Sequence, residues 1–161
     1  MPWRDGPHPL VSRRVERAAE AGYARSSPSE EVSMPKANTP EDTSRLIGEA
    51  ITSRDMDAVL ALYEPDATFA MPTGFGEGSV TGHDGLREAF SGFLALNPTL
   101  TVNAEKTLVS GDTALVIGHW TLKGRDADGN DIDANGRYAD VVRRQPDGDW
   151  LFVIDNPNGS D

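Results

Sequence analysis

The chain has 161 residues, of which 37% are hydrophobic and 25% are charged, as in a soluble globular domain with a polar extra segment. Its formal net charge is −11, it contains no cysteine, and no apolar run reaches membrane-spanning length. Disulfides, cysteine nucleophiles and thiolate metal sites are therefore excluded, and the three histidines are scattered without metal-ligand spacing. The N-terminus lacks the apolar segment of a secretory signal, so we expect a cytoplasmic protein without a metal or other cofactor.

The acidic charge is concentrated in residues 39–161, which hold nine Lys and Arg against 21 Asp and Glu. A domain this negative repels phosphate backbones, so we predict no nucleic-acid partner. The lack of a long apolar run likewise predicts no membrane partner.

Residues 1–38 form a separate extension that is rich in proline and polar residues. Such a segment buries too little apolar surface to offset its ordering entropy, although residues 11–24 have the pattern of a short, marginal helix. Two interpretations stay open: a flexible tail, or an arm that packs on the domain or on a partner subunit. Met34 also begins a stretch that resembles a natural start, so the residues before it could lie outside the natural protein. We place the folded domain at residues 39–157 and a C-terminal tail at 158–161.

Three helices are predicted at the start of this domain. Thr39 is a typical N-cap and Pro40 suits the first turn, and the apolar residues that follow recur at helical spacing. Asp55 caps a second helix, which we expect to end before Pro65 because proline disfavours helical geometry in the preceding residue. The third helix covers residues 83–96.

The remainder of the domain has the pattern of β-structure. A short strand is predicted at residues 67–71, followed by a glycine-rich loop at 72–81. Alternating apolar residues then predict four strands, at 99–109, 114–123, 132–145 and 150–155. Three helices followed by a four-stranded meander indicate an α+β fold. A strongly curved, mostly antiparallel sheet wrapped over the helices would form a cone that encloses a pocket.

Three segments resemble motifs of the nuclear-transport-factor-2-like superfamily. Residues 55–69 (DMDAVLALYEPDATF) are similar to its acidic and apolar helix motif and the strand after it. Residues 82–90 (GHDGLREAF) resemble its third helix, and residues 147–157 (DGDWLFVIDNP) resemble its closing strand. The superfamily includes ketosteroid isomerase, the SnoaL-like polyketide cyclases and many small proteins of unknown function. The resemblance implies the cone-shaped fold and leaves the chemistry open.

The resemblance also locates the positions of the isomerase active site. That site combines a carboxylate base with an oxyanion hole made of a tyrosine and a protonated aspartate. Aligned with these motifs, Met71 occupies the position of the base, Ile47 that of the tyrosine, and only Asp140 matches. We therefore expect no steroid isomerisation by this mechanism.

Asp140, Asp155 and Tyr138 are the candidate catalytic residues. Strand alternation places Tyr138 and Asp140 on one face, and the resemblance points this face and Asp155 into the pocket. Two carboxylates brought together share a proton, which makes one an acid and the other a base, and Tyr138 would add a phenolic donor. The alternatives are a solvent-facing Asp140, a strand-ending turn at Asp155 and a core role for Tyr138.

Eight further residues are predicted to line the pocket or its mouth: Ile47, Phe69, Met71, Phe75, Val116, Gly118, Trp120 and Val153. Gly118 would leave room for a ligand ring or permit a strong bend in the sheet. His119 is expected on the opposite face of the sheet, in a structural role.

The outer face of the sheet is predicted to carry the apolar residues Leu115, Ile117, Val141, Trp150, Phe152 and Ile154, with Trp150 and Phe152 as either core or interface residues. Such a face needs covering, and members of the superfamily usually cover it by forming a homodimer through the sheet. We expect the same of this chain.

Two functions are consistent with these features. The first is binding of a small apolar or aromatic molecule, with cofactor-free carboxylate acid–base catalysis of the isomerase, cyclase, dehydratase or hydrolase type. The alternative is a non-catalytic ligand-binding or dimerisation module with the same cavity.

Overall fold

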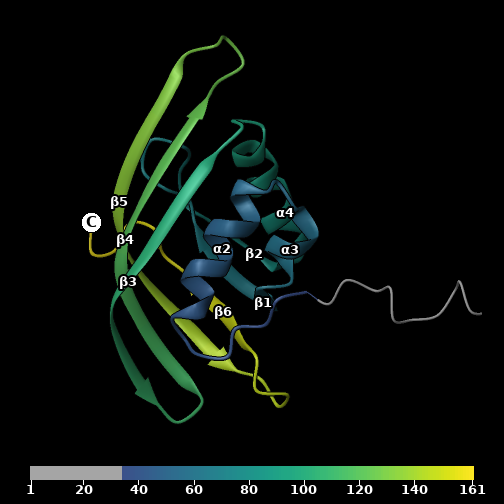
Figure 1. Cartoon of the computed structure of the whole chain (residues 1–161), viewed down its shortest axis with the longest axis vertical. Helices are drawn as coiled ribbons and strands as arrows, with labels where there is room; N and C mark the ends of the chain where they lie inside the picture. The colour runs from purple at the N-terminus through teal and green to yellow at the C-terminus, as the bar shows by residue number, and fades with distance from the viewer. Residues whose placement is uncertain (1–33) are drawn as a thin grey trace, which may run out of the picture. The chain divides into compact units, whose positions relative to one another are not determined.

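The computed structural model describes residues 34–161, so the predicted helix at 11–24 and most of the extension lie outside the described residues. Three helices and six strands follow one another in this part of the chain (Figure 1). They are α2 (Asp42–Thr52), α3 (Met56–Leu60), β1 (Tyr63–Ala70), β2 (Ser79–Thr81), α4 (Gly82–Leu94), β3 (Thr99–Ser110), β4 (Thr113–Arg125), β5 (Asp131–Arg144) and β6 (Trp150–Asp155).

The strands form one curved sheet in the order β2-β1-β6-β5-β4-β3. All neighbouring strands are antiparallel except β1 and β6, which run parallel. The helices lie on one face of this sheet, and the long strands β3 to β5 arch past them (Figure 1). The predicted α+β class and the curved, mostly antiparallel sheet are therefore confirmed.

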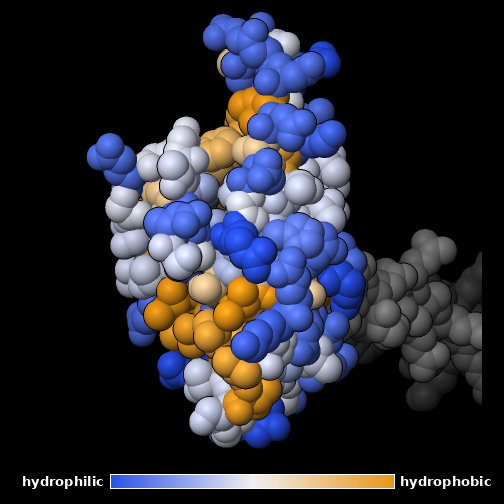
Figure 2. All heavy atoms as spheres, turned by 90° about the vertical axis from the view of Figure 1, so that its left-hand side faces the viewer, coloured by the Kyte–Doolittle hydropathy of each residue, from blue (hydrophilic) through white to orange (hydrophobic). Residues whose placement is uncertain are grey.

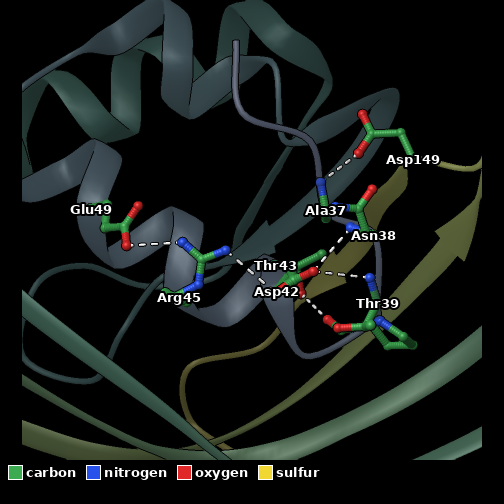
Figure 3. Close-up of polar contacts among 9 residues, drawn as sticks. Ala37, Asn38, Thr39, Asp42, Thr43, Arg45, Glu49 and Asp149 are labelled. Carbon is green, nitrogen blue, oxygen red and sulfur yellow. Dashed lines mark hydrogen bonds and ion pairs between the residues drawn. The ribbon is translucent and has the colours of Figure 1, made fainter.

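The first helix starts later than the sequence pattern indicates. Its N-cap is Glu41, without a side-chain capping bond, so the prediction of Thr39 as the N-cap is wrong. The Asp42 carboxylate instead accepts hydrogen bonds from the backbone N–H groups of Asn38 and Thr39, both at 3.0 Å (Figure 3). An acid in the first helical turn therefore satisfies the donors that precede the helix.

The residues next to the predicted domain boundaries also make contacts within the folded unit. Ala37 is fully buried, and its N–H donates to the Asp149 carboxylate at 2.8 Å. The N–H of Trp150 donates in turn to the Ala37 carbonyl at 3.0 Å. Beyond residue 157, the Asn158 side chain accepts from the N–H of Thr73 at 2.9 Å. The compact unit accordingly comprises residues 34–161.

Strand β1 replaces what the sequence pattern predicts as the end of a helix. Helix α3 ends at Leu60, and β1 already begins at Tyr63, with Pro65 inside the strand. Pairing with β6 is irregular between Tyr63 and Thr68, where a proline without an N–H can be accommodated. Part of the predicted glycine-rich loop forms β2, which pairs with the end of β1. The change of element moves Tyr63 into the sheet.

Strand β6 contains a bulge at Val153. Val141 of β5 pairs with Ile154, and the next residue, Val142, pairs with Phe152. Two residues on β6 therefore oppose one on β5, which leaves Val153 as the additional residue. Such an insertion reverses the alternation of side chains on the two sides of the bulge.

The bulge corrects the predicted outer face of the sheet. Trp150 and Phe152 are core residues with 5% and 1% of their surface exposed, whereas Ile154 is 43% exposed. The Phe152 ring stacks on Tyr63 with a centroid separation of 4.8 Å. Simple period-2 alternation along β6 was wrong because it omits the inserted residue.

No helix within residues 34–161 is both long and apolar enough to cross a membrane.

Candidate functional site

A cavity of about 80 Å³ lies between the helices and the concave face of the sheet. Its wall is mainly apolar, with contributions from α2, α4 and five strands. The aliphatic and proline residues in the wall are Ile47, Ile51, Pro72, Leu100, Val102, Leu122 and Pro157. The aromatic residues are Phe69, Phe75, Phe90, Phe93, Trp120 and Tyr138, and the two acids are Asp140 and Asp155.

The structure brings together all three candidate catalytic residues, Tyr138, Asp140 and Asp155, in the wall of this cavity. Four of the eight predicted lining residues join them: Ile47, Phe69, Phe75 and Trp120.

The other four predicted lining residues, Met71, Val116, Gly118 and Val153, do not line the cavity. The Met71 side chain packs over Gly76, where an added Cβ would lie 2.9 Å from its terminal methyl. Val116 is fully buried in the core, and Val153 is the bulge residue.

Gly118 leaves room for a protein side chain, and its other predicted role, a bend in the sheet, stays a prediction. A Cβ at this position would lie 2.8 Å from the Tyr138 ring and 2.0 Å from the carbonyl oxygen of Asn103. The glycine thus leaves room for the Tyr138 side chain to lie over the neighbouring strand β4. There its hydroxyl reaches the buried Ser44 hydroxyl of α2 at 2.8 Å. Burial raises the pKa of Tyr138 to about 12, so its phenol stays protonated at neutral pH.

The two acids form a hydrogen-bonded pair. Asp140 and Asp155 are 4% and 9% exposed, and their carboxyl groups lie within hydrogen-bonding reach of each other, so a proton on one of them can bridge the pair. The N–H of Asn156 donates to Asp140 Oδ1 at 2.8 Å, and the Tyr63 hydroxyl donates to Asp155 Oδ2. Protein donors on both sides therefore hold the pair in place.

Burial changes the proton affinity of both acids. It raises the pKa of Asp155 to about 6, and burial together with the Asp155 charge raises the pKa of Asp140 well above its ordinary value. Two hydrogen-bonded carboxyls in an apolar wall hold one proton between them near neutral pH. Asp140 is then the neutral acid, and Asp155 is the carboxylate, which accepts hydrogen bonds from Asp140 and Tyr63.

Tyr63 is the site residue that the sequence reasoning missed. The sequence pattern places it at the end of a helix, but parallel pairing of β1 with β6 brings its phenol to Asp155. Burial raises its pKa well above the ordinary value, so it acts as a donor. Pro65 indicated only where the helix must end, because proline disfavours helical geometry in the residue directly before it, and no local pattern showed that β1 begins at Tyr63.

Trp120 is held in the wall by its own polar atom. Its indole N–H donates to the Pro157 carbonyl at 2.8 Å. A Cβ at Gly136 would lie 2.8 Å from the indole ring, so glycine there leaves space for the ring on the neighbouring strand. The sequence reasoning did not identify Gly136 either.

No group of three or more histidine or acidic side chains in residues 34–161 is arranged to hold a metal ion.

Residues 44–153 match the SnoaL-like domain family, and the chain belongs to this family. Solved structures with the same fold include a putative aromatic ring hydroxylase from Novosphingobium aromaticivorans, 27% identical, with a TM-score of 0.63 over 74% of this chain and 85% of that one. A ketosteroid isomerase-like protein from Erwinia carotovora atroseptica is 22% identical, with a TM-score of 0.61 over 71% and 88%.

A nuclear transport factor 2-like superfamily protein from Salmonella enterica is 18% identical, with a TM-score of 0.62 over 75% of this chain and 90% of that one. The predicted nuclear-transport-factor-2-like fold is thereby confirmed. No curated protein matches the chain.

Proposed function

We propose that this chain is a cytoplasmic protein that binds a small apolar or aromatic molecule in the cavity and transfers a proton on it. Asp155 is the base and Asp140 the acid, and the step needs no cofactor. The observation that carries the proposal is a buried, hydrogen-bonded carboxyl pair in an otherwise apolar cavity wall.

The environment of the pair suits acid–base chemistry at neutral pH. A general base works best when its pKa lies near the operating pH, and burial raises the pKa of Asp155 to about 6. The neighbouring Asp140 can return a proton to another atom of the same ligand. Isomerisation, cyclisation, dehydration and hydrolysis all use such a paired transfer.

The cavity also limits the ligand. Ile47 lines the cavity where the isomerase-like arrangement needs a tyrosine, and Met71 does not line it at all. The volume of about 80 Å³ is smaller than the roughly 150 Å³ of an engineered cavity that holds benzene. We therefore propose a ligand of about one ring or less and not a steroid.

Deuterium exchange provides a direct test. Cyclopentanone is incubated with the protein in D₂O, and loss of its α-proton signal is followed by NMR. We expect the wild type to accelerate the exchange and Asp155→Asn to abolish the acceleration, because the amide is no base. Asp133→Asn is the matched control. It makes the same substitution on the same strand, β5, but at an exposed side chain, whereas Asp140 is buried.

The outcomes separate the two functions. Acceleration that survives in both Asp140→Asn and Asp155→Asn would contradict the roles assigned to the pair. Cyclopentanone that shifts cavity resonances without faster exchange would favour the non-catalytic binding module. If cyclopentanone neither binds nor exchanges its α-protons faster, the proposal is overturned.

We also propose a homodimer through the outer sheet face. Leu108, Leu115, Val141 and Ile154 lie opposite one another across β3, β4, β5 and β6 and form an apolar row. Leu108 and Ile154 are 52% and 43% exposed, and Figure 2 shows apolar side chains gathered on this face. An exposed apolar patch of this kind commonly marks an interface.

Sedimentation tests this assembly. We expect a dimer at micromolar concentration and a monomer for Leu115→Lys, which places a charge in the apolar row. Thr121→Lys is the control, because it adds the same charge on the same face of β4 outside the row. A wild type that sediments only as a monomer would overturn the dimer.

A further inference from the structure

The shared proton leaves the cavity with one net negative charge. Two carboxyl groups that are hydrogen-bonded to each other have one proton between them, and the donors Tyr63 and Asn156 are both neutral. Above a pH of about 6 the pair therefore carries a charge of −1. In the resting pair, Asp140 donates its proton in a hydrogen bond to Asp155, so this proton does not cancel the charge.

Within residues 34–161, no cationic side chain lines the cavity to balance this charge. The cavity wall contains no lysine, arginine or histidine among the described residues. The three arginines of β5 pair elsewhere: Arg137 with Glu105 at 2.8 Å, Arg143 with Glu64 at 3.5 Å, and Arg144 with Asp112 at 2.6 Å. A buried charge without a counter-ion is costly, so a ligand that brings a positive charge gains the interaction that the protein does not supply.

The remainder of the wall also suits a cation. Six aromatic residues line the cavity, and aromatic ring faces attract ammonium groups, with tryptophan the strongest. The Trp120 N–H is already bonded to Pro157, so the indole offers its ring and not its polar hydrogen. An aromatic enclosure with one anionic group is the arrangement that recognises organic cations.

We propose that the cavity binds a small organic cation, a protonated amine with an apolar body, and that the Asp140–Asp155 pair is its counter-ion. This inference rests on the proposed function, because it assumes that the cavity takes a ligand. It adds the ligand's charge, and a cavity of about 80 Å³ restricts its size to a few heavy atoms.

Three molecules of the same shape test the charge: isobutylamine, isobutanol and isobutyrate. Binding at pH 7.5 is followed by NMR at two reporters in the site, the Asn156 amide, which bonds to Asp140, and the Trp120 indole N–H. We expect the amine to bind at least about tenfold more tightly than the alcohol, and isobutyrate not to bind.

Removing the charge should remove the preference. In Asp140→Asn/Asp155→Asn the amine and the alcohol should bind equally, whereas Asp133→Asn should keep the wild-type preference. Equal or tighter binding of isobutanol to the wild type would overturn the cation inference and leave the small-molecule function standing. Failure of all three to perturb either reporter would overturn the inference and count against the function itself.

A pH series on the wild type covers the case of a double variant that does not fold. The titratable groups facing the pair are Tyr63 of β1 and Tyr138 of β5, and both phenols stay protonated. His83 of α4 contacts the backbone carbonyl of Tyr63 at 3.0 Å and not the pair itself, so His83→Gln is the control.

Amine affinity should fall by up to about tenfold per pH unit below 6, as the pair gains its second proton, and the same fall should occur in His83→Gln. Amine affinity that is independent of pH from 7.5 to 5 would overturn the inference.

Discussion

Acidic residues on the two faces of the sheet have opposite environments. On the concave face, Asp140 is buried and bonded to another carboxyl, and burial raises its pKa. On the convex face, Glu105 is exposed and bonded to His119 at 2.7 Å and Arg137 at 2.8 Å, which lower its pKa. Both faces carry carboxylates, so composition alone does not distinguish a buried acid pair from a surface ion pair. The difference lies in access to water and in the partner, and these come from the packing.

The largest expected effect is on the free energy of unfolding, and it concerns Phe152 and Ile154 of β6, which lie on opposite faces of the sheet on either side of the bulge. Phe152→Ala should lower the free energy of unfolding by about 3–5 kcal/mol, because it empties a fully buried site stacked on Tyr63. Ile154→Ala should change it far less, because Ile154 is 43% exposed. Urea denaturation measures both, and similar losses would contradict the bulge at Val153.

The concave face should also make stability depend on pH. A carboxyl whose pKa is raised in the folded state stabilises the fold fully below its unfolded value of 3.8, and this contribution is lost as pH rises through about 6. Relative to Asp140→Asn/Asp155→Asn, the wild type should lose unfolding free energy between pH 4 and 7, with about 3 kcal/mol of the loss from Asp155 alone and a further loss in the same direction from Asp140, whose pKa is also raised. Denaturation series at several pH values measure the difference. Parallel pH profiles for the two proteins would show that the pair does not share a proton in the fold.

A smaller effect on stability is expected at Gly118, where the Tyr138 side chain lies over β4. Gly118→Ala would place a methyl 2.0 Å from the Asn103 carbonyl oxygen, so the backbone must shift, at a cost of about 1–3 kcal/mol. The new methyl should also displace the Tyr138 hydroxyl from Ser44. Thermal denaturation checks the stability, and Gly92→Ala on α4 is the control, because nothing lies within 4 Å of its added Cβ. Equal stability of Gly118→Ala and the wild type would refute the close approach.

The smallest effect is expected on the convex face. Glu105→Gln removes the charge that pairs with His119 and Arg137, yet all three side chains are exposed. Exposed ion pairs contribute little and are screened by salt. We expect no resolvable change in the denaturation midpoint in 0.15 M salt. A clear loss would mean that the convex face is desolvated, as it would be at the edge of a dimer interface.

Much of the fold could be predicted from local patterns. Asp55 caps α3 by accepting from the Ala58 N–H at 3.0 Å, as its position before the helix indicates. Alternation along β5 placed Tyr138 and Asp140 on one face, and in the structure both are buried there. These features depend on residues a few positions apart, so the chain's own periodicity is sufficient to predict them.

The sequence by itself therefore determined the α+β class, the three helices, the four-stranded meander and the candidate pair Asp140 and Asp155. Only the tertiary structure decided that Tyr63 donates to Asp155, because parallel pairing of β1 and β6 joins residues 92 positions apart. It also decided that Phe152 is buried, because the bulge is defined by the register between two strands. Local periodicity carries no information on register, and for that reason the acids were found from the sequence but their donor was not.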